Sequence, residues 1–365
     1  MKKLLILVLY SLSLNLNLFS IPLTSVSYPN LITDGPYIFN VNGTFTMKWI
    51  NNSVLKEETV TEENFSDIKK RFNLRCSFND LNNTYSLKPD FRQTYKKVDS
   101  IGVLTDVHGE YKVYLNLLKA MGIIDKNLNW SFGSGHLVIA GDVFDRGEMV
   151  NELFWHLFGL EKQAAEAGGM VHLLIGNHEL MVLSRDLRFI SEKYKEVERI
   201  SGTKYFELYS DSSVIGNWIR KKPVMITINN LLFVHGGISI ELIRKNIGIP
   251  DINEAFCNRI IGKDMEVVCE DEELLFYCSS LGPLWYRGYF NDKTFCESRL
   301  DSILNYYGKK RIIVGHTPGS EISSMYKRKV LGTDSGIGNM KPGEMLMIKY
   351  GILYKGRSNG KRIKL

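Results

Sequence analysis

Residues 141–147 read Gly-Asp-Val-Phe-Asp-Arg-Gly, and this segment directly follows a short apolar run, Leu137–Ala140. The apolar run has the length and composition of a buried strand. Sheets in α/β proteins bind ligands at the carboxyl ends of their strands. The segment therefore predicts a strand that ends in a functional turn, and we expect comparable turns after neighbouring strands.

Four further polar clusters follow apolar runs in the same way. The runs are Ser100–Leu104, Val171–Ile175, Leu231–Val234 and Arg311–Val314. The clusters are Asp106-Val107-His108-Gly109, Gly176-Asn177-His178-Glu179, His235-Gly236-Gly237 and Gly315-His316-Thr317. Helical patterns lie between the runs, at Tyr111–Met121 and Glu148–Ala167. Strands that alternate with helices predict an α/β domain.

The side chains of these clusters offer carboxylates, imidazoles and one amide oxygen, but no thiolate. This mixture suits Mn, Fe or Zn, whereas Ca avoids imidazole. Two such cations that share a carboxylate form a site for in-line displacement at phosphorus. The pattern therefore predicts two divalent metal ions.

Together the five clusters resemble those of the calcineurin-like metallophosphoesterases, within them the phosphoprotein phosphatase family, and within that family the Shewanella-like protein phosphatase branch. The resemblance covers residues 97–350 and implies a four-layer α/β/β/α sandwich. It implies that the first metal is bound by Asp106 and His108, that Asp142 bridges both metals, and that the second metal is completed by Asn177, His235 and His316.

The resemblance also implies a mechanism for hydrolysing a phosphomonoester of a phosphorylated protein or a small molecule. A hydroxide held between the metals attacks phosphorus, and His178 protonates the leaving oxygen as the general acid. Asp145 orients His178. Arg146 and Arg287 bind phosphate oxygens through their planar guanidinium groups.

Two departures from the family pattern concern Thr105 and the residues that follow His316. Thr105 stands where the family usually has glycine, which we expect to alter backbone freedom more than chemistry. His316 is followed by Thr317-Pro318 rather than by a second histidine, which favours the phosphoprotein phosphatase branch. A dinucleoside polyphosphate hydrolase stays open as an alternative, and a non-catalytic exported binding protein is a more distant one.

Several residues near these motifs have simpler interpretations. His136, His156 and His172 are expected to be structural, and the charge of Glu179 suits a helix N-terminus. The aromatic residues between 285 and 290 are expected to pack in the core, with a pocket for an aromatic phosphate as the alternative.

The ends of the chain predict export and a separate tail. Lys2 and Lys3 precede an apolar stretch to residue 19, so residues 1–20 are expected to be a signal peptide, or an anchor if uncleaved. The protein would then be periplasmic or secreted, or in the secretory lumen of a eukaryote. No second segment is long enough to span a membrane. Residues 351–365 are expected to form a basic tail.

Composition supports a globular protein without a nucleic-acid partner. The 365 residues are 44% hydrophobic and 24% charged, which excludes disordered and fibrous classes. The net charge of +6 matches the excess in residues 341–365, which hold seven basic residues and one acidic residue. No nucleic-acid recognition motif accompanies this charge.

Two further regions lie outside the motifs. Residues 21–96 are expected to be an extension with a β-hairpin around Asn42-Gly43. Residues 250–300 form an expected insertion that bears Cys257, Cys269, Cys278 and Cys296. In an exported protein these predict two disulfides of open connectivity, with Cys76 left over.

Overall fold

The strand pattern of the sequence becomes two six-stranded sheets and one three-stranded sheet in the computed structural model, which describes residues 31–365. The predicted leader lies outside the described residues. Among residues 31–365, no helix combines the length and apolar character that crossing a membrane requires.

The two large sheets contain all of the predicted motif strands. One has the order β11 (Ser323–Met325), β12 (Val330–Gly332), β10 (Arg311–Val314), β9 (Leu231–Val234), β8 (Met225–Ile228) and β4 (Thr94–Tyr95). The other has the order β15 (Arg362–Lys364), β14 (Ile352–Gly356), β13 (Met345–Lys349), β5 (Ser100–Leu104), β6 (His136–Ile139) and β7 (Met170–Leu173). Strands β5, β6 and β7 are parallel, and so are β9, β10 and β12.

Side-chain alternation along the strands builds the layers. In β6, Val138 belongs to a buried cluster that joins both large sheets, together with Ile226 and Phe233 of β8 and β9. Leu137 and Ile139 point the other way and join the core under the helices. Because successive strand residues face opposite sides, both faces of each sheet are covered. The arrangement is the four-layer α/β/β/α sandwich that the family resemblance implied.

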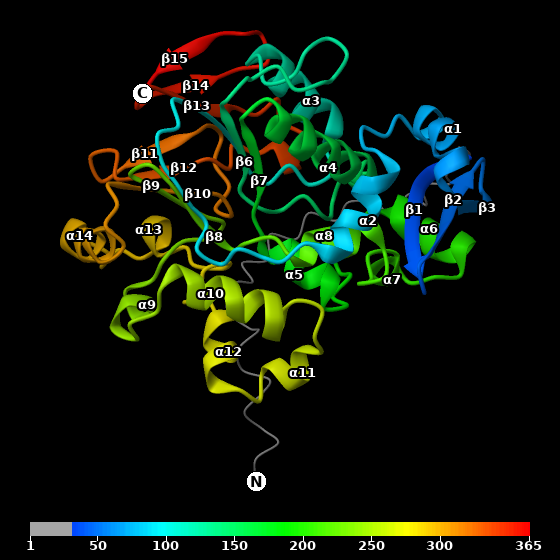
Figure 1. Ribbon diagram of the computed structural model, residues 1–365. Coiled ribbons are helices and arrows are strands. Elements are labelled where there is room, and N and C mark those ends of the chain that lie inside the picture. The colour runs from blue at the N-terminus through cyan, green and yellow to red at the C-terminus, as the bar shows by residue number, and fades with distance from the viewer. Residues whose placement is uncertain (1–30) are drawn as a thin grey trace, which may run out of the picture. The chain divides into compact units, whose positions relative to one another are not determined.

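Helices cover the outer faces of the sheets (Figure 1). The helices that accompany β5–β7 are α3 (Tyr111–Ala120), α4 (Val150–Glu166) and α5 (Asn177–Leu183). The helices that accompany β8–β10 are α9 (Ile240–Arg244), α10 (Ile249–Ala255), α13 (Gly288–Asn291) and α14 (Glu297–Tyr306). Helix α4 contacts β7, and α10 contacts β8.

The N-terminal region forms a small sheet that packs on the main domain. It has β1 (Asp34–Val41), β2 (Thr44–Asn51) and β3 (Val54–Val60), followed by α1 (Glu62–Phe72) and α2 (Phe78–Ser86). Asn42 and Gly43 both have positive φ, 53° and 85°, in the turn between β1 and β2, as a tight hairpin requires. The predicted hairpin is thus present, and it is extended by a third strand.

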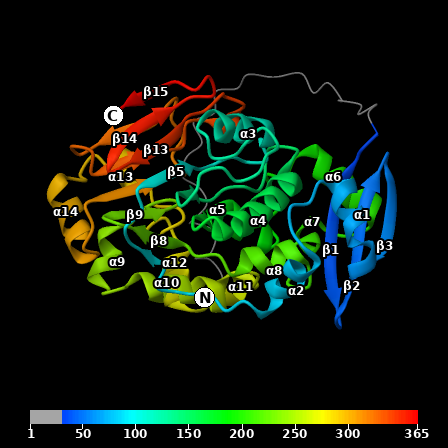
Figure 2. The ribbon, with the colours of Figure 1, turned by 45° about the horizontal axis from the view of Figure 1, so that its top comes forward.

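The small sheet is joined to the helices α6 (Glu192–Ser201), α7 (Tyr205–Leu208) and α8 (Val214–Arg220) (Figure 2). Helix α8 contacts β1, and α6 contacts β2 and β3. The Pro36 carbonyl accepts hydrogen bonds from Trp155 Nε1 at 2.9 Å and from Asn151 Nδ2 at 3.3 Å, both on α4. The extension therefore shares its buried polar groups with the helix that follows the GDVFDRG segment.

The region 250–300 is helical, and its cysteines are not paired. It contains α10, a π-helical turn (Phe256–Ile260), α11 (Met265–Val268), α12 (Glu272–Tyr277), α13 and the start of α14. All five cysteines are free in the structure, so the expectation of two disulfides is wrong. Four of the cysteines, Cys257, Cys269, Cys278 and Cys296, lie in or beside four separate helices. The number and spacing of cysteines in a sequence do not reveal the distance and orientation that a disulfide requires.

The end of the chain belongs to a sheet. Strand β14 pairs with β13, and β15 pairs with β14, so residues 352–364 extend the sheet that contains β5. A turn in which Tyr350 and Gly351 have positive φ separates β13 from β14. Lys355 lies on β14, Arg362 and Lys364 lie on β15, and Arg357 and Lys361 lie in the connection between these strands. The expectation of a separate tail at 351–365 is therefore wrong.

Stability of the N-terminal sheet should depend on one buried ion pair. Lys193 Nζ lies 2.6 Å from Asp34 Oδ1, and the Asp34 side chain is fully buried. Lys193→Met removes the only cation beside this carboxylate among the described residues and should lower the free energy of unfolding by about 3 kcal/mol. Urea denaturation measures this value.

The matched control is Lys195→Met on the same helix. Lys195 pairs with Glu192 at the surface, where such pairs contribute about 1 kcal/mol or less. Equal losses in the two variants would contradict a structural role for the Lys193–Asp34 pair.

Candidate active site

The five polar clusters converge at the carboxyl ends of β5, β6, β7, β9 and β10. Two groups of possible metal ligands share Asp142: one has His108 and His178, and the other has His235 and His316. Within each group the candidate ligand atoms lie within 4.8 Å of one another, and all five residues are buried. The predicted bridging position of Asp142 is therefore central in the structure.

The tautomer of His108 prepares it to bind a cation. Its Nδ1 lies 2.8 Å from the Phe144 carbonyl, which can only accept, so the proton is on Nδ1. Burial lowers the pKa of His108 to about 3, so the ring is neutral. Nε2 is buried without a hydrogen-bond partner and lies 3.7 Å from Asp142 Oδ2. An unpaired buried lone pair beside a carboxylate fits a metal ligand.

His235 marks a second position that favours positive charge. Its Nδ1 donates to the Ala140 carbonyl at 2.8 Å. Its Nε2 lies 3.0 Å from Asn177 Oδ1 and 3.2 Å from Asp142 Oδ2, both of which are acceptors. Burial opposes a charged ring, but Asp142 raises the pKa of His235 to about 10. A proton or a metal cation at Nε2 satisfies these oxygens, and the donor set suits Mn, Fe or Zn.

Asp106 and His316 join the same cluster through the backbone. Asp106 Oδ2 accepts the Thr105 hydroxyl at 2.6 Å and the His316 amide at 3.0 Å. Burial, with Asp334 beside it, raises the pKa of Asp106 to about 8. Thr105 therefore contacts a predicted ligand directly, whereas Thr105 was expected to affect backbone freedom more than chemistry. Burial lowers the pKa of His316 to about 2, so its imidazole is neutral.

His178 and Asp145 form the predicted acid pair. His178 Nδ1 lies 2.5 Å from Asp145 Oδ2, and the His178 amide donates to Asp142 Oδ1 at 3.0 Å. Burial alone would lower the pKa of His178, but Asp142 and Asp145 together raise it. Its Nε2 lies 3.8 Å from Asp142 Oδ2, close to the distance found for His108, so geometry alone admits His178 as a ligand as well.

The two predicted phosphate-binding arginines lie at the rim of the cluster. Arg146 and Arg287 are both exposed, and within residues 31–365 neither guanidinium has an acidic partner. Arg146 lies near enough to influence the pKa of His178, and Arg287 influences that of His316. They therefore bracket the cluster from two different segments.

Glu179 anchors the turn that carries Asp142, in addition to placing a charge at a helix N-terminus. Its carboxylate accepts the amides of Asp142 at 2.8 Å, Val143 at 2.7 Å, Phe144 at 3.2 Å and Gly176 at 2.8 Å. It is fully buried. Glu179 is thus an anchor for the GDVFDRG turn as well as a helix N-terminal charge. A buried turn with several free amides, followed by a nearby acid, is the signal that could have indicated it.

The loop that carries Arg287 is tied to the His235 loop. The Pro283 carbonyl accepts the amides of Gly236 at 2.9 Å and Gly237 at 3.1 Å. Tyr289 hydrogen bonds to both backbone groups of Ile238. The structure therefore brings part of the region 250–300 to the cluster.

The three remaining histidines are structural, as expected. His172 and His136 hydrogen bond to each other at 2.9 Å and pack against Tyr95. His156 bonds to the Tyr114 hydroxyl and to the Leu128 carbonyl, both at 3.0 Å.

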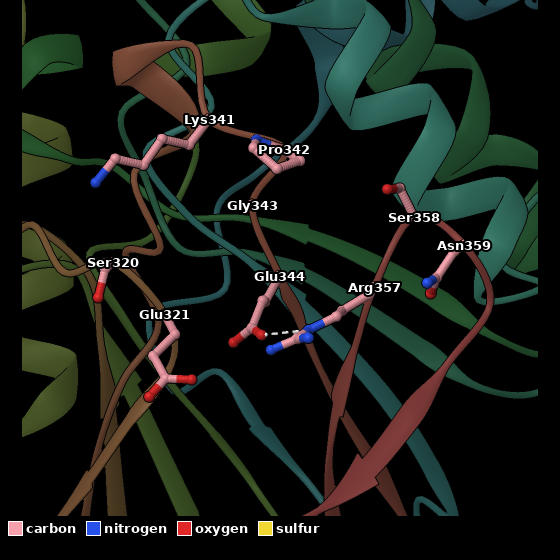
Figure 3. A pocket seen from close by; sticks show the side chains of 9 residues that line it. All are labelled: Ser320, Glu321, Lys341, Pro342, Gly343, Glu344, Arg357, Ser358 and Asn359. Atoms are coloured by element: carbon pink, nitrogen blue, oxygen red, sulfur yellow. Dashed lines mark hydrogen bonds and ion pairs between the residues drawn. The ribbon is translucent and has the colours of Figure 1, made fainter.

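A pocket of about 390 Å³ lies along the segments that follow His316 and the 3₁₀ turn Ile337–Asn339 (Figure 3). In the pocket, Glu344 accepts a hydrogen bond from Arg357 Nε at 2.9 Å. Glu321, which also lines the pocket, pairs with Lys355 at 2.9 Å. Its lining contains none of the predicted site residues. The chemistry is therefore concentrated in the buried cluster and not in this pocket.

The fold and the donor set together are those of a metal-dependent hydrolase of phosphoric monoesters. The family model for calcineurin-like phosphoesterases matches residues 100–320. The chain belongs to the calcineurin-like phosphoesterase family.

Individual relatives are phosphatases. The crystal structure of a cold-active protein-tyrosine phosphatase from a psychrophilic Shewanella species is similar with a TM-score of 0.83 and 36% identity, covering 92% of this chain and 99% of that chain. Shewanella-like protein phosphatase 1 of Plasmodium berghei is 29% identical over 70% of this chain and 71% of that protein. Shewanella-like protein phosphatase 2 of Arabidopsis thaliana is 24% identical over 67% of this chain and 72% of that protein.

Glu179→Gln should destabilise the turn at residues 142–144, which carries the predicted ligand Asp142. In the wild-type protein, Glu179 Oε2 accepts the amides of Asp142 and Gly176. A glutamine side chain keeps one acceptor oxygen but replaces the other with an NH2 group, which cannot accept a hydrogen bond from a backbone amide. We expect a loss of about 2 kcal/mol in the free energy of unfolding. Bound Mn, measured by elemental analysis after incubation and desalting, should fall as well.

Glu148→Gln is the control, because Glu148 is exposed just after the same turn. Unchanged metal content in Glu179→Gln would show that the turn does not need its carboxylate.

Proposed function

We propose that this protein is a phosphoprotein phosphatase whose reaction uses two divalent cations. The observation that carries the proposal is the sharing of Asp142 between two buried ligand groups, with the His178–Asp145 pair and two exposed arginines around them. Metal ions, an acid and phosphate-binding cations are what hydrolysis of a phosphate ester requires.

Asp106, His108 and Asp142 would hold one cation, and Asp142, Asn177, His235 and His316 would hold the other. We propose Mn, Fe or Zn, because these metals accept imidazole and carboxylate ligands together. When bound, such cations lower the pKa of a coordinated water and neutralise charge on phosphate oxygens. The neutral rings of His108 and His316 meet the requirement that ligand nitrogens carry lone pairs.

His178 would supply the proton that the leaving oxygen needs. Asp145 fixes the ring through Nδ1, which leaves Nε2 to face the cluster. Burial lowers the pKa of His178, but Asp142 and Asp145 together raise it, which favours the protonated ring that a general acid needs. Asp145 acts by orienting the imidazole and stabilising its charge.

Arg146 and Arg287 would bind the phosphate oxygens that do not react. Their guanidinium groups have no acidic partner among residues 31–365, so they are available for a dianion. Planar guanidinium groups bind phosphate in a bidentate manner. Because they come from segments on different sides of the cluster, they would fix the orientation of the ester.

A substrate panel tests the proposal. The metal-loaded protein is assayed with phosphotyrosine peptide, phosphothreonine peptide and diadenosine tetraphosphate, before and after chelation. We expect release of inorganic phosphate from a phosphopeptide, loss of activity on chelation, and recovery with Mn. Cleavage of the dinucleotide alone would support the alternative hydrolase, and no turnover would contradict the proposal.

We also propose that the protein is exported, on the basis of Lys2, Lys3 and the apolar stretch that follows them. Intact mass of the protein recovered outside the cytoplasm tests this. A full-length mass confined to the cytoplasm would contradict it.

His178→Asn should lower turnover of alkyl phosphates by about 100-fold or more, because their leaving oxygen needs a proton. Turnover of p-nitrophenyl phosphate, which has a good leaving group, should fall much less. The bound metal, measured in parallel, should not change. A lost metal ion would instead assign His178 as a ligand, and equal losses on both esters would exclude it as the general acid.

Arg287→Ala should raise KM for phosphopeptide by about 10-fold, as expected for the loss of a charged hydrogen bond of about 1.5 kcal/mol. Metal content should stay the same. Arg328→Ala is the control, since Arg328 is exposed at the amino end of β12, away from the strand ends that carry the ligands. An unchanged KM in Arg287→Ala would remove Arg287 from the binding site.

A further inference from the structure

An exposed aromatic ring lies beside the proposed general acid. Phe189 is 47% exposed, and its ring centroid lies 5.4 Å from that of His178, at an interplanar angle of 56°. His178 is itself buried. Large apolar side chains left open next to polar reactive groups are typical of ligand-binding sites. An exposed aromatic ring therefore lies next to the group that would protonate the leaving oxygen.

The backbone holds Phe189 at this position. The Phe189 carbonyl accepts the amide of Arg146 at 2.9 Å, and Arg146 has a left-handed φ of 63°. The loop before it is fixed by the amide of Asp186, which donates to the Met181 carbonyl on α5 at 2.8 Å. The backbone of Phe189 thus bonds directly to Arg146, and the loop that carries Phe189 is anchored to α5, the helix that contains His178.

The side chain of Phe189 is also supported from its neighbour. The guanidinium of Arg188 lies 5.6 Å from the Phe189 ring centroid. Two nitrogens of Arg188 contact the Asp186 carboxylate, at 2.8 and 2.7 Å. This support orders the ring without covering it, so it costs little entropy to use the ring as a contact surface.

The other aromatic candidates are occupied by the core. Tyr286 and Tyr289 are only 8% and 3% exposed, and they pack edge to face with a centroid distance of 5.2 Å. The Tyr289 hydroxyl is bonded to Ile238. The aromatic segment that the sequence singled out is therefore not free to contact a substrate, whereas Phe189 is.

We propose that Phe189, supported by Arg188, is a contact surface for the leaving group and gives the enzyme a preference for aryl phosphate esters such as phosphotyrosine over alkyl esters. The inference rests on the proposed phosphatase activity. In the hydrolysis, the oxygen of water bonds to phosphorus as the phosphorus–oxygen ester bond breaks, and His178 gives its proton to the leaving oxygen. The proton that the attacking water loses passes to solvent, from which His178 is protonated again. The group attached to that oxygen must then lie near His178, where Phe189 can contact an aromatic ring.

The first test compares two peptides of one sequence that carry phosphotyrosine or phosphoserine at the same position. In Phe189→Ala, kcat/KM for the phosphotyrosine peptide should fall by about 3- to 10-fold, the range for one lost aromatic contact. The phosphoserine peptide should change by less than about 2-fold. Phe189→Tyr should retain the preference, and Phe189→Leu should lose part of it.

The second test measures binding without turnover. Phenylphosphonate and methylphosphonate are titrated into the metal-loaded protein by calorimetry, and the ratio of their Kd values should collapse in Phe189→Ala. Tyr350→Ala is the matched control, because Tyr350 is 71% exposed in the turn between β13 and β14, at the opposite end of the strand from the ligands.

The outcomes separate the two proposals. Equal losses on both peptides, or an unchanged phosphonate ratio, would overturn the role of Phe189 while leaving the phosphatase intact. A wild-type protein that hydrolyses neither peptide with metal present would overturn the proposed function, and this inference with it.

Discussion

The site depends on one buried carboxylate that never needs to touch a substrate. Glu179 receives four backbone amides from the turn after β6 and from the start of α5. The same turn presents Asp142, and its Phe144 carbonyl sets the tautomer of His108. Because hydrogen bonds to a charged acceptor are strong in a buried site, Glu179 fixes ligands from two strands at once.

The backbone at the site is held in conformations that ordinary residues avoid. Left-handed φ values occur at six predicted site residues: Asp106, His108, Asp142, Asp145, Arg146 and His316. Such residues cost free energy and persist only where the surroundings enforce them. Gly176 and Gly315 make the enforcement possible, since a Cβ at either would collide with the carboxylate of Asp142 or Asp106. These backbone conformations lower the stability of the fold, but they allow the predicted ligands to converge.

Most of the strands of the two large sheets and the polar clusters could be predicted from the sequence, because each depends on residues that are neighbours along the chain. Strands β5, β9 and β10 have the expected bounds. Contacts between loops that are distant along the chain could not be predicted from the sequence. The approach of Phe189 to Arg146 and the hold of Glu179 on the turn at 142–144 are of this kind. The prediction of two disulfides was wrong for a related reason. Cysteines pair only where the fold brings their Cβ atoms close together, and their number in the sequence does not reveal this. The strands after residue 350 were not predicted because their residues are strongly basic. Two of these basic residues, Arg362 and Lys364, lie on the edge strand β15, where lysines and arginines are well tolerated.

The position of β13 between β14 and β5 has a consequence for work with fragments. The residues matched by the family model end at 320, before β12 and β13. A chain cut there would leave β10 and β5 with open edges in both large sheets. Unpaired edges of buried, apolar strands recruit other chains, so a fragment trimmed to the family boundaries would tend to aggregate. By pairing with β10 and β5, strands β12 and β13 protect the protein from edge-to-edge association of its large sheets.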